Sequence, residues 1–230
     1  MKQERKPMIK IFFRNHVIHK KIVPYFDYLF LFRPTLFFAV WVMICIGMYL
    51  AHLEIENYPQ WILSVNLKTI LLFLSLSLIS GSAFITNQLN DLESDKENNK
   101  LFLLNNFLDK AIAIRIYNFS LVLGFLLLSF TNIYNLIVGF LLFIIWDVLY
   151  NKNKTKWRKH PFLGPLCNLI AGILLIVSGW LIIICNNSYF PPITSIFSVY
   201  FIIRILPYGI CYLSVVLLTD IPDEKGDNKF

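Results

Sequence analysis

Residues 70–95 read ILLFLSLSLISGSAFITNQLNDLESD, an uncharged apolar run that passes directly into a cluster of acids. A run of about 20 such residues is long enough to cross the hydrocarbon core of a bilayer as a helix. The stretch therefore predicts a membrane-spanning helix with polar side chains where it leaves the membrane: Asn87, Asp91 and Asp95. Their spacing of four residues would place all three on one helix face.

The rest of the chain follows the same apolar pattern. It is 57% hydrophobic and 15% charged, whereas a soluble domain has about 25% charged residues. We therefore expect an all-α fold, a polytopic transmembrane helical bundle. The apolar runs predict about six spans, at residues 28–51, 63–88, 109–131, 133–150, 162–186 and 194–219. Residues 1–24 are expected to form a basic cytoplasmic or interfacial segment, and residues 25–230 the transmembrane domain.

The basic residues predict the orientation of these spans. They gather in the N-terminal segment, between spans two and three, and between spans four and five, whereas residues 52–60 and 186–192 contain no Lys or Arg. We therefore expect the N-terminus and these basic segments to face the cytoplasm, in a bacterial inner membrane. The net charge of +7 fits contact with anionic membrane lipid, and no pattern typical of nucleic-acid binding accompanies it.

A second acid cluster follows span six, where residues 220–227 read DIPDEKGD. Pro222 and Gly226 predict that the helix ends near Asp220 and that a turn presents Asp223 and Asp227. The two clusters hold eight of the 14 acids of the chain, and the expected topology brings both to the cytoplasmic face. Mg²⁺ prefers oxygen ligands and commonly bridges carboxylates to phosphates. The pair of clusters therefore predicts a Mg²⁺ site for a phosphorylated ligand.

The loop at residues 150–161, YNKNKTKWRKHP, is basic and is expected on the same face. Positive-inside charge explains part of it, and it also suits a diphosphate held between metal and cations. The four Cys lie in apolar runs without metal-ligand or disulfide spacing, which is typical of buried small apolar residues.

Together these motifs resemble the UbiA superfamily of intramembrane prenyltransferases. Asn87-x-x-x-Asp91-x-x-x-Asp95 is similar to its first acidic motif, and Asp220-x-x-Asp223-x-x-Gly226-Asp227 to its second. Arg33-Pro34 resembles the Arg-Pro that opens many members, and Tyr150-x-x-x-Lys154 followed by Arg158 resembles a third conserved segment. The likeness runs from about Tyr25 to the last residue.

The resemblance implies transfer of a prenyl group from a prenyl diphosphate to a lipophilic acceptor, usually an aromatic ring. It implies Mg²⁺ as cofactor, with catalytic and metal-binding roles for Asp91, Asp95, Asp220 and Asp227, and a metal-binding role for Asp223 as well. It implies substrate binding by Asn87, Asp223, Tyr150, Lys154 and Arg158.

Asp147 and Arg204 are ionisable residues inside predicted spans. Asp147 either faces the cavity or pairs with a neighbouring helix, because an ionisable residue in a span needs one or the other. Arg204 is expected to have a structural role, paired with an acid or a polar acceptor.

The sequence also departs from the family pattern. Residues 100–110 lack the Arg-Pro element that usually follows the first motif. The family fold has nine helices, so we expect its last three to be absent from this chain, with a second chain as one possible source of them. On this basis we expect weak or no activity from the chain alone.

Three alternatives remain at this point. A non-enzymatic membrane subunit that still binds prenyl diphosphate would carry the same motifs. A transporter is disfavoured because the acids lie at one face and no inverted repeat is visible. A CDP-alcohol phosphotransferase is disfavoured because its Asp-Gly and Ala-Arg pattern is missing.

Overall fold

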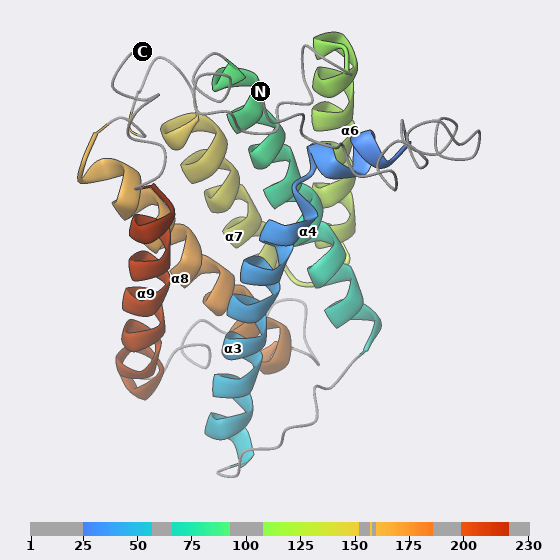
Figure 1. The fold of residues 1–230 in the computed structure, drawn as a ribbon. Helices are drawn as coiled ribbons and strands as arrows, with labels where there is room; N and C mark the ends of the chain where they lie inside the picture. The colour runs from blue at the N-terminus through green and yellow to red at the C-terminus, as the bar shows by residue number, and fades with distance from the viewer. Residues whose placement is uncertain are drawn as a thin grey trace, which may run out of the picture.

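Every regular element in the described part of the chain is a helix, as the sequence predicts (Figure 1). The structure is a computed structural model, and it describes residues 25–56, 66–92, 108–151, 157, 160–185 and 199–220. Its main helices are α3 (Phe37–Glu56), α4 (Leu67–Asn90), α6 (Lys110–Ser129), α7 (Ile133–Phe143), α8 (Leu163–Ile184) and α9 (Val199–Asp220). Two short elements complete them: the 3-10 helix η1 (Pro34–Leu36) and the π-helix η2 (Ile144–Tyr150), which continues α7.

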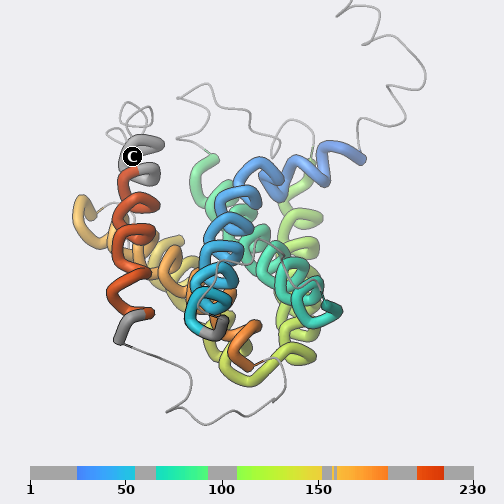
Figure 2. The backbone as a smooth tube through the Cα atoms, turned by 90° about the horizontal axis from the view of Figure 1, so that it is seen from below, coloured from blue at the N-terminus to red at the C-terminus, as the bar shows by residue number. Residues whose placement is uncertain are grey.

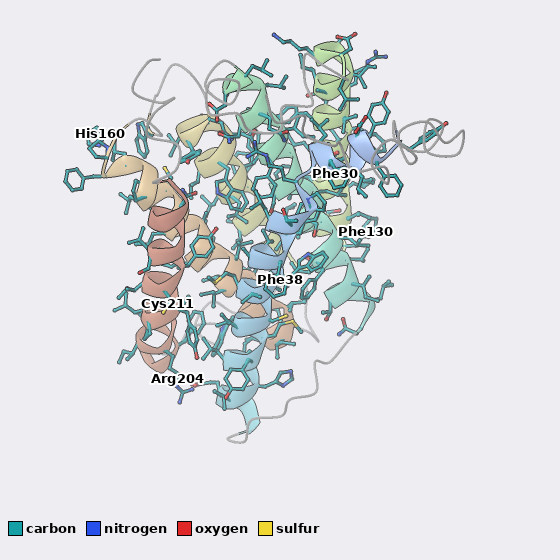
Figure 3. The ribbon with its side chains drawn as sticks, in the orientation of Figure 1. Phe30, Phe38, Phe130, His160, Arg204 and Cys211 are labelled. Atoms are coloured by element: carbon teal, nitrogen blue, oxygen red, sulfur yellow. The ribbon has the colours of Figure 1, made fainter. Side chains whose placement is uncertain are left out.

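The predicted spans correspond to these helices. Among the described residues, five helices are long and apolar enough to cross a membrane: Pro34–Glu54, Leu67–Asn90, Lys110–Ser129, Ile133–Tyr150 and Leu163–Ile184. The sixth predicted span corresponds to α9, whose apolar part covers Phe201–Ser214. Large apolar side chains such as Phe38, Phe119 and Phe130 are more than 60% exposed, and Figure 3 shows Phe38 and Phe130 at the outside of the bundle. An apolar exterior is what a membrane-spanning bundle requires.

The first span begins later than the sequence predicts. A helix expected to run without a break from residue 28 is interrupted at Arg33, which has φ 48° and ψ 61°. Pro34 explains the break, because a proline disfavours the α conformation at the residue before it. Residues 25–31 therefore form a separate helix, which Figure 2 shows running across the end of the bundle.

The helices pack most extensively in two pairs, α3 against α8 and α4 against α6. Fully buried side chains such as Ile44, Leu76 and Leu175 form the main core. At the α3–α8 crossing, Gly47 faces the backbone of Ile176, and Gly179 faces the backbone of Ile44. Close backbone contact through glycine is a common way for membrane helices to associate. α9 lies at one edge of the bundle beside α8, and α6 lies at the opposite edge (Figures 1 and 2).

Successive helices run in alternating directions, which determines where the site lies. α4, η2 and α9 all run toward one end of the bundle, where α6 and α8 begin (Figure 1). We call this end the acid-cluster end, because α4 finishes there at Asn90 and Asp91 follows it. The helix that ends at Asp220 therefore runs toward the same end as the helix that precedes Asp91.

Candidate functional site

The structure describes part of the predicted site. The side chains of Asn87, Asp91 and Tyr150 are described, and all three are half-buried. For Asp220 the structure describes only the backbone, as the last residue of α9. The remaining predicted site residues lie outside the described residues: Asp95, Lys154, Arg158, Asp223 and Asp227.

The first acid cluster begins where α4 ends. Asp91 caps the helix with φ −101° and ψ 10°, and its backbone N–H donates to the carbonyl oxygen of Asn87 at 3.0 Å. Asn87 and Asp91 are therefore neighbours across the last turn of α4. The predicted single helix face is present for these two residues, and its extension to Asp95 lies outside the described residues.

Asparagines hold this end of α4 against the end of η2. The Asn90 side-chain amide donates to the backbone carbonyl oxygen of Asn151. The Asn151 side-chain amide in turn donates to the backbone carbonyl oxygen of Ala83 at 3.0 Å. Because Asn151 directly follows Tyr150, these bonds bring the first acid cluster and the Tyr150 segment together. Neither Asn90 nor Asn151 was predicted as a site residue, although a polar amide beside each motif is a signal for such a contact.

Tyr150 is the last residue of the π-helix η2. The backbone N–H of Asn151 donates to the carbonyl oxygen of Trp146 at 3.0 Å, five residues earlier, which is the π-helical pattern. Tyr150 packs against the main core, so its ring is held by the bundle. π-Helical turns often occur at functional sites, and this one leads directly into the predicted diphosphate-binding loop.

Asp147 lies one turn deeper in the bundle and is 2% exposed. Its Oδ1 accepts a hydrogen bond of 3.0 Å from the hydroxyl of Thr86 on α4. The Tyr117 hydroxyl on α6 lies close enough to this carboxylate to interact with it electrostatically. The prediction that Asp147 pairs with a neighbouring helix is therefore confirmed.

The helix at residues 25–31 packs beside the site. The Gln88 side-chain amide donates to the carbonyl oxygen of Leu31 at 2.7 Å. Leu31 is fully buried in a small apolar cluster with Ile85, Leu108 and Ala113. This contact attaches the segment before Arg33-Pro34 to the turn of α4 that precedes Asp91.

The residues at this end suit a divalent cation in their chemistry. Within the described residues, no group of three His, Cys, Asp or Glu side chains comes together. Asp91 is the only predicted metal ligand whose side chain the structure describes. Its half-buried carboxylate lies next to the side-chain amide of Asn87 at a helix end, and carboxylate and amide oxygens are ligands that Mg²⁺ accepts.

Arg204 lies away from the site. Its Nη1 is 3.3 Å from Oε2 of Glu54 near the end of α3, and Figure 3 shows Arg204 and His160 at opposite ends of the bundle. The predicted pairing of Arg204 with an acid is confirmed, and its structural role stays a prediction.

We predict that Arg204→Gln has a small effect. The side chains of Arg204 and Glu54 are 43% and 29% exposed, and exposed ion pairs contribute about 0–1 kcal/mol. Thermal unfolding in detergent should therefore change little, and binding of a prenyl diphosphate should stay within about twofold of the unaltered protein. A much larger loss of binding would instead place Arg204 in the binding site.

The fold and the site define a class of protein: a helical membrane protein with a half-buried carboxylate, that of Asp91, and several amide side chains at one end of an apolar bundle. A model of the UbiA prenyltransferase family matches residues 39–230, so the chain belongs to this family. The match begins after Arg33-Pro34, later than the likeness from Tyr25 that the motifs suggest. No curated protein and no solved structure matches the chain. Family membership supports an intramembrane prenyltransferase activity, which is transfer of a prenyl group to a lipophilic acceptor.

Proposed function

We propose that this protein catalyses Mg²⁺-dependent transfer of a prenyl group from a prenyl diphosphate to a lipophilic, aromatic acceptor within the membrane. The observation that carries the proposal is the convergence of Asn87, Asp91 and Tyr150 at the acid-cluster end. α9 runs toward the same end and finishes at Asp220. Family membership supports the type of reaction.

In this proposal the two acid clusters hold the cation and the basic loop binds the diphosphate. The carboxylates that would hold Mg²⁺ are those of Asp91, Asp95, Asp220, Asp223 and Asp227, with the Asn87 amide beside the first. Bound there, the ion would stabilise the negative charge that develops on the departing diphosphate. Lys154 and Arg158 would bind diphosphate oxygens, and Tyr150 would orient them.

The reaction breaks the bond between the first prenyl carbon and its diphosphate oxygen. The diphosphate leaves with the bonding electrons, and a ring carbon of the acceptor attacks the allylic cation. The ring then loses a proton and regains its aromaticity. An apolar bundle suits this chemistry because it holds the isoprenoid chain and limits the water that would quench the cation.

The orientation is part of the proposal. Basic segments before span one, after span two and after span four favour a cytoplasmic N-terminus and a cytoplasmic acid-cluster end. This arrangement suits a bacterial inner membrane, where a prenyl diphosphate would arrive from the cytoplasm and the acceptor from the lipid phase.

Removal of Mg²⁺ tests the proposal directly. We expect the 230-residue chain in lipid nanodiscs to bind farnesyl S-thiolodiphosphate, which resists cleavage, at least about tenfold more tightly with Mg²⁺ than with EDTA. Scintillation proximity with labelled ligand measures this binding without knowledge of the acceptor. Equal binding in Mg²⁺ and in EDTA would contradict the metal site.

A second measurement separates an enzyme from a binding subunit. The same nanodiscs are incubated with labelled farnesyl diphosphate and a panel of hydroxylated aromatic acids, and lipid-soluble products are extracted. Product formation that requires Mg²⁺ supports the transferase. Metal-dependent binding with no product from any acceptor would fit the non-enzymatic subunit and also an enzyme that needs a second chain for turnover.

A further inference from the structure

Among the residues that the structure describes, the proposed chemistry leaves one buried acid without a role. Asp147 lies in η2 within the span Ile133–Tyr150 and is 2% exposed. A carboxylate inside a membrane-spanning segment is costly and generally marks a function. It belongs to neither acid cluster, so the expected metal ligands do not account for it.

The Asp147 carboxylate connects η2 to α4. The Thr86 hydroxyl reaches it from α4 through a hydrogen bond of 3.0 Å. The Thr86 hydroxyl also lies 3.2 Å from the carbonyl oxygen of Ser82 on its own helix. A buried hydrogen bond between the side chains of two segments restricts how those segments rotate and slide against each other.

These contacts lie about one helical turn further into the bundle than the proposed site. Thr86 immediately precedes Asn87, and Asp147 lies three residues before Tyr150. One turn further out, the Asn90 amide donates to Asn151, so α4 and η2 are joined at two successive levels. The inner level is the only one of the two that involves a carboxylate.

We propose that Asp147 is a positioning residue that holds the end of α4 in the register in which Asn87 and Asp91 face the Tyr150 segment. The proposal rests on the proposed function, because this register of α4 is needed only if Asn87, Asp91 and the Tyr150 segment together form a diphosphate site. Such sites require their groups within about 0.5 Å and 10–20° of the productive geometry. Some residues contact and orient the metal ligands without contacting the metal. Their replacement typically lowers metal affinity by about 10–100-fold.

The test compares substitutions at both ends of the Thr86–Asp147 hydrogen bond. We expect Asp147→Leu and Thr86→Val each to raise the Mg²⁺ concentration for half-maximal farnesyl S-thiolodiphosphate binding by about tenfold or more. The double variant should be little worse than Asp147→Leu, because Thr86 acts through Asp147. Asp147→Asn keeps an oxygen that can accept from Thr86 and should retain more of the affinity.

The matched control is Thr131→Val. Thr131 is also fully buried, and its hydroxyl donates to the Leu128 carbonyl oxygen at 2.7 Å. It lies between α6 and α7, at the end of the bundle away from Asp91. Its replacement removes the same hydroxyl from the interior, and the Mg²⁺ dependence should stay within twofold of the unaltered protein.

Hydrogen exchange separates failure of this proposal from failure of the proposed function. Without any ligand, Asp147→Leu and Thr86→Val should increase backbone exchange across residues 83–90, and Thr131→Val should not. If the unaltered protein binds no prenyl ligand, the proposed function fails and exchange still tests the positioning. If Asp147→Leu does not fold, the exchange and the Mg²⁺ dependence of Thr86→Val and Asp147→Asn test the positioning role instead. Unchanged exchange and unchanged Mg²⁺ dependence in folded variants would overturn the proposal.

Discussion

Replacement of Asp91 by asparagine is expected to reduce Mg²⁺-dependent binding of farnesyl S-thiolodiphosphate by about 10–100-fold. Prenyl transfer to any acceptor found should fall by about 100–1,000-fold, since the charge that develops on the diphosphate would lose stabilisation. The reason is that Asp91 places a half-buried carboxylate at the end of α4, next to Asn87. Asparagine has a similar size but no charge, so it is a poorer partner for a cation.

Asp109→Asn provides the matched control for this experiment. Asp109 is exposed and caps α6, where its side chain accepts from the backbone N–H of Ala111 at 3.0 Å. Because α6 begins at the acid-cluster end, this substitution removes a carboxylate from the same end. Asparagine caps a helix about as well as aspartate, so folding and binding should be retained. Equal effects of the two substitutions would indicate general electrostatics and would exclude a specific role for Asp91.

The second large effect is expected from Gly179→Ala at the crossing of α3 and α8. A Cβ atom on Gly179 would collide with the backbone carbonyl of Ile44. The carbonyl cannot move without its helix, so α3 and α8 would have to separate along the most extensive contact in the bundle. We expect a loss of at least about 2 kcal/mol, which corresponds to a fall of roughly 5 °C in the melting temperature in detergent.

Gly209→Ala is the control for this substitution. A Cβ atom on Gly209 would meet the ends of two side chains, Ile173 and Leu169, both at 3.3 Å. Flexible side-chain ends can adjust, and alanine favours a helix by up to about 1 kcal/mol over glycine. The melting temperature should therefore be unchanged or slightly raised. If Gly179→Ala behaved like Gly209→Ala, the close backbone contact of α3 and α8 would be refuted.

The positions of the helices were largely predictable because each one is an apolar run between polar segments. The run at 133–150 was predicted with the bounds that the structure has, Ile133–Tyr150. The same pattern could not reveal that its last part, Ile144–Tyr150, is a π-helix. Apart from Asp147, the side chains there are apolar like most of those in α7, so the difference lies in the backbone hydrogen bonds. The break at Arg33 was also missed, although Pro34 is a local signal for it.

The candidate site was predictable to a smaller extent. The acid clusters could be identified from the sequence because acids are scarce in this chain. The alternation of spans predicted that Asp91 and the end of α9 lie at the same end of the bundle. The hydrogen-bond partners of the residues around the first cluster could not be identified from the sequence. Asn151 bonds to Ala83, and Gln88 bonds to Leu31, across 68 and 57 residues of sequence. Asp147 was recognised as unusual, but its partner Thr86 lies on another helix, 61 residues away in sequence.

The sequence by itself therefore determined the membrane class, the spans and the acidic residues that lead to the UbiA family, because hydrophobicity and charge act residue by residue along the chain. The tertiary structure alone decided how α4 is held against η2 and α6, and how closely α3 approaches α8. These arrangements depend on hydrogen bonds and backbone contacts between residues far apart in sequence. Their geometry exists only once the helices have packed.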